Sequence, residues 1–450
     1  MTGKERIFAV LSGKKTDKIP WVPFAGVHAG KLIGADAREV STDLDKLTAS
    51  LKEVNRIYKP DGQPVMFDLQ IEAEILGCDL VWSDSGPPTV SSHPLSETNE
   101  IPSLMPSPED GRLPLELQAM RVMKEAVGEH TALYRLLCGP FTLASHLRGT
   151  NIFMDMMLDP DYVHQLLEYT LQVSKRMAEL FIDAGMDVIA AVDPLISQIS
   201  PDHFTEFMHK PFSELFAFIR EKGVWSSFFV CGNATMNIEP MCRTRPDNIS
   251  IDENVDLAGA KAVTDPYNIV ISGNIPLTSV MLFGNQQDNM KATVELIDSV
   301  SKNLLIISPG CDMPYDIPIE NTLAIEQAVH ETDTVRKMVE NYQSSGIEFT
   351  GTLPDYDSLE RPLVEVFTLD SATCAACTYM LAAAEDVKEH AEFDIDVVEY
   401  KYTTPENIAR CREMGVKQLP SIYINGQLAY SSLIPSRQEL TEKIKEAAES

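Results

Sequence analysis

The sequence has no apolar run approaching the ~20 residues needed to cross a bilayer, and its first residues lack the apolar core of a signal peptide. Basic residues are also few. The 37 Lys and Arg are outnumbered by 67 Asp and Glu, which gives a formal net charge of −30 at pH 7. Such a charge argues against nucleic acid and anionic membranes as partners. These absences predict a soluble, cytoplasmic protein.

Cysteine is sparse as well, because the 450 residues contain only 8 of them. This usage fits a reducing compartment, where neighbouring thiols more often bind metal or carry redox chemistry than crosslink a fold. The length exceeds what one hydrophobic core usually supports, so at least two domains are expected. We expect Cys78, Cys138, Cys242 and Cys411 to be small, buried apolar residues.

Short apolar runs alternate with longer amphipathic stretches over the first three quarters of the chain. This alternation is typical of parallel strands with helical connections. The predicted strands are 19–24, 64–67, 131–137, 187–192, 225–230, 248–251, 268–272 and 304–308. The clearest predicted helices are 161–184, 201–222, 290–301 and 319–343. A short strand and a long helix, repeated, predict an α/β fold with a (β/α)8 TIM barrel over residues 1–345.

Residues 346–361 are predicted to form a linker because Gly, Pro and Asp interrupt them. The pattern then restarts over residues 362–450 with an apolar strand at 363–369 and Cys374-Ala-Ala-Cys377 at the head of a helix. Further on, Pro420 precedes an apolar strand that ends in Asn-Gly. This arrangement resembles the thioredoxin superfamily, so the second domain is expected to be small and thioredoxin-like.

The thioredoxin resemblance assigns catalytic roles to three residues. The amino terminus of the helix is expected to lower the pKa of Cys374 and make it the attacking thiol, and Cys377 then resolves the mixed disulfide. Pro420 is expected to be the cis-proline packed beside them.

Two other cysteines end predicted strands of the barrel. Cys231 follows the run 225–230, and Cys311 follows the run 304–308 after a short turn. Because barrel active sites lie at the carboxyl ends of the strands, both thiols are expected in one mouth, where they suggest a thiolate metal site. Asp68 and Asp193 also follow strands, and each is as well explained by a helix N-cap as by catalysis.

The barrel also carries motifs of a known family. They are Thr2-Gly-Lys-Glu-Arg6, Cys138-Gly-Pro-Phe-Thr-Leu-Ala144, Ser250-Ile-Asp-Glu253, Ser272-Gly-Asn-Ile-Pro276 and Gly310-Cys-Asp-Met-Pro-Tyr-Asp-Ile-Pro-Ile-Glu-Asn321. The barrel thus resembles the uroporphyrinogen decarboxylase superfamily, and within it the corrinoid-dependent methyltransferases. The decarboxylases hold porphyrin carboxylates with arginines near the amino terminus, whereas Trp21–Gly30 contains none. Porphyrinogen decarboxylation is therefore not expected.

The resemblance implies methyl transfer between methylcobalamin on a corrinoid protein and a small thiol or related acceptor. In that branch zinc is held by a His-x-Cys motif and a later Gly-Cys turn, and it activates the acceptor thiol. Cys231 and Cys311 match the two zinc cysteines, but the histidine position is Phe229. The metal site would then need other ligands, for which Glu72, His28 and Asp193 are candidates.

Other roles follow from the same resemblance. Asp68 and Asp193 are expected to position or protonate the acceptor, and Asn233 and Asn274 are candidates for cofactor binding. Barrels of this family can pair, so a homodimer is possible.

Three interpretations stay open for the fused redox domain. It could reduce a disulfide formed by Cys231 and Cys311, handle a thiol substrate, or pass electrons to a corrinoid partner. The first requires Cα atoms within about 7 Å of each other. The competing functions are a thiol-disulfide oxidoreductase, whose barrel is a substrate- or corrinoid-binding platform without zinc, and a non-enzymatic corrinoid-docking scaffold.

Overall fold

The computed structural model describes residues 1–344, 349–356, 358–371, 375–416, 418–432 and 434–449. The chain forms two compact units, one containing Met1–Ile196 with Ser200–Ser344 and the other containing Ser197–Ile199 with Ser345–Ser450. Within the described ranges, no helix is long and apolar enough to cross a membrane.

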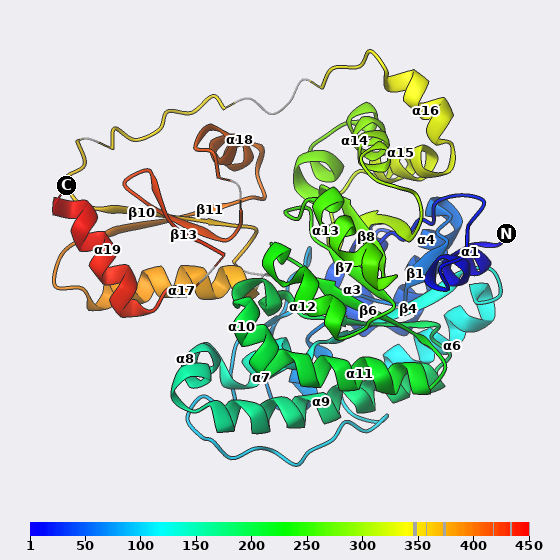
Figure 1. The fold of residues 1–450 in the computed structure, drawn as a ribbon, viewed down its shortest axis with the longest axis horizontal. Coiled ribbons are helices and arrows are strands. Elements are labelled where there is room, and N and C mark those ends of the chain that lie inside the picture. Colours follow the sequence, from blue (N-terminus) through cyan, green and yellow to red (C-terminus); the bar gives the residue numbers. More distant parts are fainter. Residues whose placement is uncertain (345–348, 357, 372–374, 417, 433, 450) are drawn as a thin grey trace. The chain divides into compact units, whose positions relative to one another are not determined.

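The first unit is built on seven parallel strands in the order β1-β4-β5-β6-β7-β8-β9 (Figure 1). The strands are β1 Gly62–Pro64, β4 Ala132–Cys138, β5 Val188–Val192, β6 Trp225–Val230, β7 Asn248–Ile251, β8 Val270–Ile275 and β9 Leu305–Pro309. Each strand pairs in parallel with its neighbours. A separate two-stranded ribbon joins β2 Leu80–Val81 and β3 Thr89–Val90.

The segment around Trp21 closes this sheet into a barrel. Trp21 forms a parallel bridge with Ile307 of β9, and its carbonyl oxygen accepts hydrogen bonds from the N–H groups of Asp61 and Gly62 beside β1. The predicted strand 19–24 is thus a single bridge rather than a full strand. Pro20 and Pro23 explain the difference, because they have no N–H to donate to a ladder.

The other strands lie close to their predicted positions, and β6 and β7 have the predicted bounds. The predicted strand 64–67 is displaced toward the amino terminus, since β1 ends at Pro64 and Met66 has a φ of 70°, which interrupts an extended strand.

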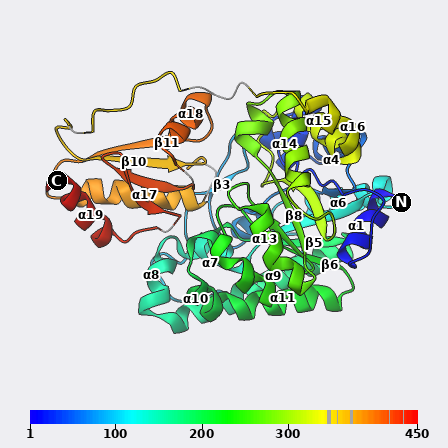
Figure 2. The same ribbon diagram turned by 45° about the horizontal axis from the view of Figure 1, so that its top comes forward.

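Helices surround the barrel, and α9 packs beside α11 on its outside (Figure 2). Before β7 come α1 Gly3–Leu11, α2 His28–Lys31, α3 Ala37–Thr42, α4 Leu44–Tyr58, α5 Ile71–Ile75, α6 Leu113–Val127, α7 Pro140–Arg148, α8 Asn151–Leu158, α9 Pro160–Asp183, η1 Pro194–Gln198, α10 Pro201–His203, η2 Phe204–Met208, α11 His209–Glu221, η3 Thr235–Asn237 and α12 Ile238–Arg243. After it come α13 Leu257–Thr264, η4 Asp265–Tyr267, η5 Leu277–Leu282, α14 Gln286–Asp298, α15 Ile319–His330 and α16 Thr332–Val339.

Two predicted helices are divided in the structure. The predicted helix 319–343 is broken at Glu331, whose φ of −127° and ψ of 39° lie outside the helical region, so α15 and α16 are separate. The predicted helix 201–222 contains the π-helical turn η2 between α10 and α11. The apolar pattern crosses both irregularities, which is why it did not predict them.

The second unit is a four-stranded sheet in the order β11-β10-β12-β13, with β10 and β11 parallel and the other pairs antiparallel. Its elements are β10 Leu363–Thr368, α17 Ala375–His390, β11 Asp396–Lys401, α18 Pro405–Glu413, β12 Ser421–Ile424, β13 Gln427–Ser431 and α19 Arg437–Glu449. One core joins side chains of β10 and β12 to α17 and α19, and a second core places Cys411 of α18 with Phe367 and Tyr423. The helices therefore cover both faces of the sheet, as expected for a thioredoxin-like domain.

The buried carboxylate of Asp61 ties the amino-terminal end of the barrel together. It accepts a hydrogen bond of 2.8 Å from the Trp21 N–H and forms ion pairs with Arg6 and, at 3.2 Å, with His330 Nε2. Burial disfavours the charged imidazole, but the hydrogen bonds to Asp61 and Glu326 raise the pKa of His330 to about 9. Charged His330 thus fixes α15 to the point where the barrel closes.

This pair predicts a pH-dependent stability of the barrel. Because the pKa of His330 is higher in the folded chain, its stabilisation is complete below the ordinary value of 6.5 and is lost as pH rises through about 9. His330→Gln should lower the free energy of unfolding by roughly 1–3 kcal/mol at pH 6 and by almost nothing at pH 10. Tryptophan fluorescence in denaturant reports this unfolding, since Trp21, Trp82 and Trp225 all lie in the barrel.

His203→Gln is the matched control, because it removes a barrel histidine that forms no ion pair among the described residues. A destabilisation by His330→Gln that stays constant from pH 6 to pH 10 would show that its charge does not stabilise the barrel.

Candidate functional site

The carboxyl ends of the barrel strands gather the candidate catalytic side chains at one mouth. Asp68 follows β1, Asp193 follows β5, Cys231 follows β6 and Cys311 follows β9. In barrels of this architecture the reaction takes place at this end, on the loops that leave the strands.

Cys231 and Cys311 are joined by a disulfide, with their Cα atoms 5.9 Å apart. The strand order places β7 and β8 between β6 and β9, so the bond spans the ends of two intervening strands. Both cysteines are half-buried and pack on the apolar interior of the barrel. The expected shared mouth is therefore present.

Glycine beside each cysteine permits this approach. Gly232 has a φ of 86°, in the left-handed region that favours glycine. A Cβ atom on Gly310 would lie 2.6 Å from the backbone nitrogen of Glu253, too close for any other residue without a shift of the backbone. Steric constraints on the backbone therefore favour glycine in both the Cys-Gly and the Gly-Cys turn.

An aromatic cluster lies in the barrel interior on which the two sulfurs pack. Phe229 is fully buried, with its ring centroid 4.8 Å from that of Phe24 and 5.7 Å from that of Phe67. At the position where the resemblance expects a zinc-binding histidine, the chain therefore has an apolar ring that helps to fill the core.

His28 and Glu72 are each engaged elsewhere. The ring nitrogens of His28 pair with the Tyr315 carbonyl oxygen at 3.0 Å and the Tyr58 hydroxyl at 2.7 Å, and burial lowers the pKa of His28 to about 4. Glu72 accepts a hydrogen bond of 3.0 Å from the Cys138 N–H. Neither residue is brought into a metal-binding group with the cysteines.

The donor set of this mouth does not fit a tetrahedral zinc ion. Among the residues that the structure describes, no group of three or more His, Cys, Asp and Glu is placed to hold a metal. The two sulfurs are bonded to each other, whereas zinc binds free thiolates. The two sulfurs are therefore not arranged as zinc ligands.

Asp68 lies in a buried ionic network. Burial opposes its charge, but the adjacent Arg112 guanidinium holds the pKa of Asp68 below its ordinary value. Arg112 also pairs with Glu74 at 2.8 Å and lies over the Trp82 ring. Asp68 does not cap α5, since the N-cap position there is Gln70. The N-cap alternative for Asp68 is thus wrong for this helix.

Asp193 binds the first turn of α7 across the mouth. Its carboxylate accepts hydrogen bonds from the Phe141 N–H at 2.9 Å and from the N–H and hydroxyl of Thr142, at 3.1 and 2.6 Å. It is fully buried, and burial raises its pKa to about 7. Asp193 therefore fixes α7 in the manner of a cap supplied by a distant segment.

The two candidate asparagines make hydrogen bonds within the mouth loops. The Asn233 side-chain oxygen accepts from the N–H and hydroxyl of Thr235, at 3.0 and 2.6 Å. The Asn274 amide donates to the carbonyl oxygens of Asp252 and Val255, at 2.9 and 2.7 Å. These contacts shape the loops after β6 and β7, and cofactor binding by either residue stays a prediction.

Three further acids at the mouth were not among the predicted site residues: Asp252, Glu253 and Asp312. Burial raises the pKa of each, and for Glu253 repulsion from Asp252 adds to the effect. The Asp312 carboxylate accepts from the Gly26 N–H at 2.9 Å. Their position just after β7 and β9, the same signal that identified Asp68 and Asp193, would have found them.

In the second unit, Cys377 lies in the first turn of α17 and is buried, and its sulfur accepts a hydrogen bond from the Leu369 N–H at 3.3 Å. The Leu419–Pro420 peptide bond is cis. Cys374 lies outside the described residues. The redox roles of these three residues stay predictions.

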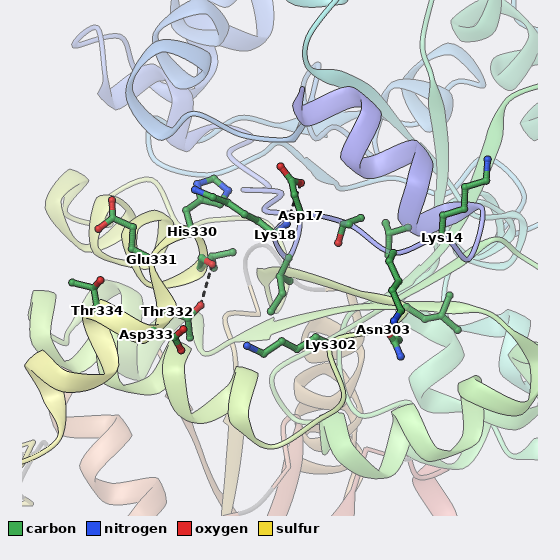
Figure 3. Close-up of a pocket in the computed structure, with 16 residues that line it drawn as sticks. Lys14, Asp17, Lys18, Lys302, Asn303, His330, Glu331, Thr332, Asp333 and Thr334 are labelled. Carbon is green, nitrogen blue, oxygen red and sulfur yellow. Dashed lines mark hydrogen bonds between the residues drawn. The ribbon is translucent and has the colours of Figure 1, made fainter. Parts of the chain in front are cut away.

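A cavity of about 510 Å³ opens at the opposite, amino-terminal end of the barrel (Figure 3). It is bordered by Lys14, Lys18, Lys302 and His330. Its lining comes from the end of α1, the segment before Trp21, the turn before β9 and the α15–α16 junction, whereas the two sulfurs follow β6 and β9. Barrel enzymes carry their active sites at the other end, where the strands end.

The fold and the mouth define a (β/α)8-barrel enzyme with a fused thioredoxin-like unit. Residues 2–332 match the family described as Uroporphyrinogen decarboxylase (URO-D), and the chain belongs to that family. Residues 363–445 match the family described as Thioredoxin domain.

Curated relatives include methyltransferases and uroporphyrinogen decarboxylases. The chain is 28% identical to the methylcobamide:CoM methyltransferase MtbA of Methanosarcina acetivorans, over 71% of this chain and 95% of that protein. It is 27% identical to the methylcobamide:CoM methyltransferase MtaA of Methanosarcina barkeri, over 73% and 98%. A solved methyltransferase from Methanosarcina mazei shares the fold with a TM-score of 0.68, at 22% identity over 76% of this chain and 99% of that one.

Glu72 provides a test of the electrostatics of the mouth. Burial raises its pKa from 4.5 to about 7, and its Oε2 atom has no hydrogen-bond partner among the residues that the structure describes. The folded chain then keeps a proton that the unfolded chain releases, so stability falls as pH rises from 4.5 to about 7. In Glu72→Gln this loss should vanish, and the variant should gain up to about 3 kcal/mol relative to wild type between pH 4 and pH 8.

The measurement is denaturant unfolding across that range, with the exposed Glu125→Gln as control. Parallel pH profiles for wild type and Glu72→Gln would refute the assignment.

Proposed function

We propose that the barrel transfers a methyl group between a corrinoid protein and a small thiol. The observation that carries this proposal is the placement of two sulfurs at the mouth of a URO-D family barrel. Relatives over nearly their whole length are named methylcobamide:CoM methyltransferases. Decarboxylation of a porphyrinogen has no comparable support, because Trp21–Gly30 contains no arginine that could bind the porphyrin carboxylates.

In the proposed direction toward the thiol, sulfur is the nucleophile. The thiol gives up its proton, its sulfur forms a bond to the methyl carbon, and the electron pair of the carbon–cobalt bond stays on the corrinoid. The protein must hold the acceptor thiol at the mouth and remove its proton. It must also exclude water, which the buried aromatic cluster below the mouth helps to do.

The charged residues of the mouth divide between positioning and proton transfer. We assign Asp68 and Arg112 a positioning role, because their ion pair holds both side chains in place beside the loop after β1. Asp193 also positions, through its bonds to α7. Glu253 is our candidate proton acceptor, since burial and Asp252 bring its pKa up toward neutrality and its backbone lies against Gly310, next to Cys311.

The finer assignments are also proposals. The corrinoid is carried by a protein partner, the acceptor is coenzyme M or another small thiol, and the chain acts in the cytoplasm as a homodimer. In the second domain Cys374 and Cys377 cycle between dithiol and disulfide beside Pro420. We propose residues 346–361 as the linker between the domains 1–345 and 362–450.

Methyl transfer is tested with reduced full-length protein, methylcobalamin as donor, and coenzyme M or other small thiols as acceptors. The methylated thiol should appear by mass spectrometry, together with the absorbance change of demethylated cobalamin. Cys231→Ser and Cys311→Ser should each lower the rate at least ~10-fold, as expected for loss of a group in direct contact with the reaction.

Cys242→Ser is the matched control, because Cys242 is a buried free thiol of α12 away from the mouth. Folded protein that transfers no methyl group to any of these thiols would contradict the proposal and favour the thiol-disulfide oxidoreductase.

A further inference from the structure

The cavity of about 510 Å³ at the amino-terminal end of the barrel gathers lysine side chains. Lys14, Lys15 and Lys18 come from the segment that follows α1, and Lys302 comes from the turn before β9. All four lysines are exposed, and none forms an ion pair within the part of the chain that the structure describes. The cavity therefore brings together cations from two distant segments.

The acids of the lining do not neutralise these lysines. Asp17 is paired with Arg6 at 2.7 Å. Asp333 is paired with Arg336 at 2.5 Å. Neither arginine lines the cavity, and Glu331 is the third acid of the lining. The cavity thus keeps an excess of positive charge in a chain whose net charge is −30.

The cavity also has an apolar wall. Val10, Ile19 and Val329 line it with buried side chains. Asn303 and Thr334 add an amide and a hydroxyl group to the lining. The volume lies in the range of roughly 300–1,000 Å³ that small-molecule sites occupy. A compact ligand with several negative charges, with or without a less polar group attached, suits this combination.

The choice of lysine favours one kind of anion. Among the described residues that line the cavity there is no arginine. Arginine offers the planar fork that matches a single carboxylate, whereas lysine acts as a point charge on a flexible stem. A polyphosphate chain carries several negative charges over a short length, so it can contact several lysines at once. A carboxylate brings only one charge.

We propose that this cavity binds a polyphosphate chain, either free or as part of a nucleoside triphosphate, and that Lys18 and Lys302 are its main contacts. Figure 3 shows Lys302 extending toward Thr332 and Asp333, whereas Lys14 points away from them. The site is separate from the mouth, and it does not depend on the proposed methyl transfer.

A ligand in this cavity would join segments that meet where the barrel closes. Lys18 lies shortly before Trp21, and Lys302 lies shortly before β9, to which the Trp21 bridge is made. His330 lines the same cavity and pairs with Asp61 at 3.2 Å. Because the lysines come together only in the folded chain, the bound ligand should stabilise the barrel.

The test is titration calorimetry on the full-length protein in magnesium-free buffer, with ATP and inorganic tripolyphosphate as probes and adenosine as the uncharged control. We expect saturable binding of ATP, tripolyphosphate or both, a higher Tm in the presence of the bound probe, and no binding of adenosine. The affinity should fall between about 50 mM and about 200 mM salt, because screening weakens exposed charge pairs. Equal affinities would identify the phosphate chain as the whole ligand, and tighter binding of ATP would identify a nucleotide.

Variants locate the binding at this cavity. Lys18→Gln and Lys302→Gln should each weaken binding at least ~5-fold, as expected for loss of a hydrogen bond between charged groups. Lys302→Arg should keep most of the affinity because it keeps the charge. Lys52→Gln is the matched control, since Lys52 is an exposed lysine of α4 outside this lining. The Tm of each variant without ligand shows whether it is folded.

Three results would overturn the proposal. The first is folded wild-type protein that binds neither ATP nor tripolyphosphate. The second is a Lys18→Gln/Lys302→Gln double variant that binds as well as wild type. The third is a loss of affinity in Lys52→Gln as large as that in Lys302→Gln, which would show that general surface charge and not the cavity attracts the probe. Methyl transfer measured on the same samples tests the proposed function separately.

Discussion

Closure of the barrel by the Trp21 segment is the interaction on which the placement of every mouth residue depends. The segment around Trp21 bonds to both β1 and β9, and the buried Asp61 carboxylate holds Trp21, Arg6 and His330 together at that seam. Without this seam the sheet would have two free edges, and the loops after its strands would not converge. The positions of the side chains at the carboxyl end therefore depend on an ionic network at the amino-terminal end.

The mouth contains several acidic side chains and two sulfur atoms, and this combination limits which substrates it can bind. Acids with raised pKa values can accept or hold protons, and the Arg112 guanidinium is already paired with Asp68 and Glu74. A polyanionic substrate would meet repulsion there, whereas a compact thiol would not. This balance agrees with methyl transfer to a small thiol at the two sulfurs.

The sequence predicts local features well and distant contacts poorly. The alternation of strands and helices predicted the barrel. The positions of Cys231 and Cys311 after two of its strands predicted that they lie together, because the carboxyl ends of parallel barrel strands meet at one mouth. The cap that Asp193 gives to α7, the Arg112 pairing of Asp68 and the Tyr58 contact of His28 join segments 30 or more residues apart. No local pattern encodes such pairs, so the proposed ligand set could not be excluded from the sequence.

The central claim is that the two sulfurs at the barrel mouth, Cys231 and Cys311, take part in methyl transfer as free thiols. The most direct measurement is the rate of methyl transfer from methylcobalamin to a small thiol, taken on one preparation before and after reduction, with the thiols at Cys231 and Cys311 counted by mass spectrometry. We expect transfer to appear in proportion to the chains in which both residues have become thiols. Equal rates in the bonded and reduced protein would contradict the account.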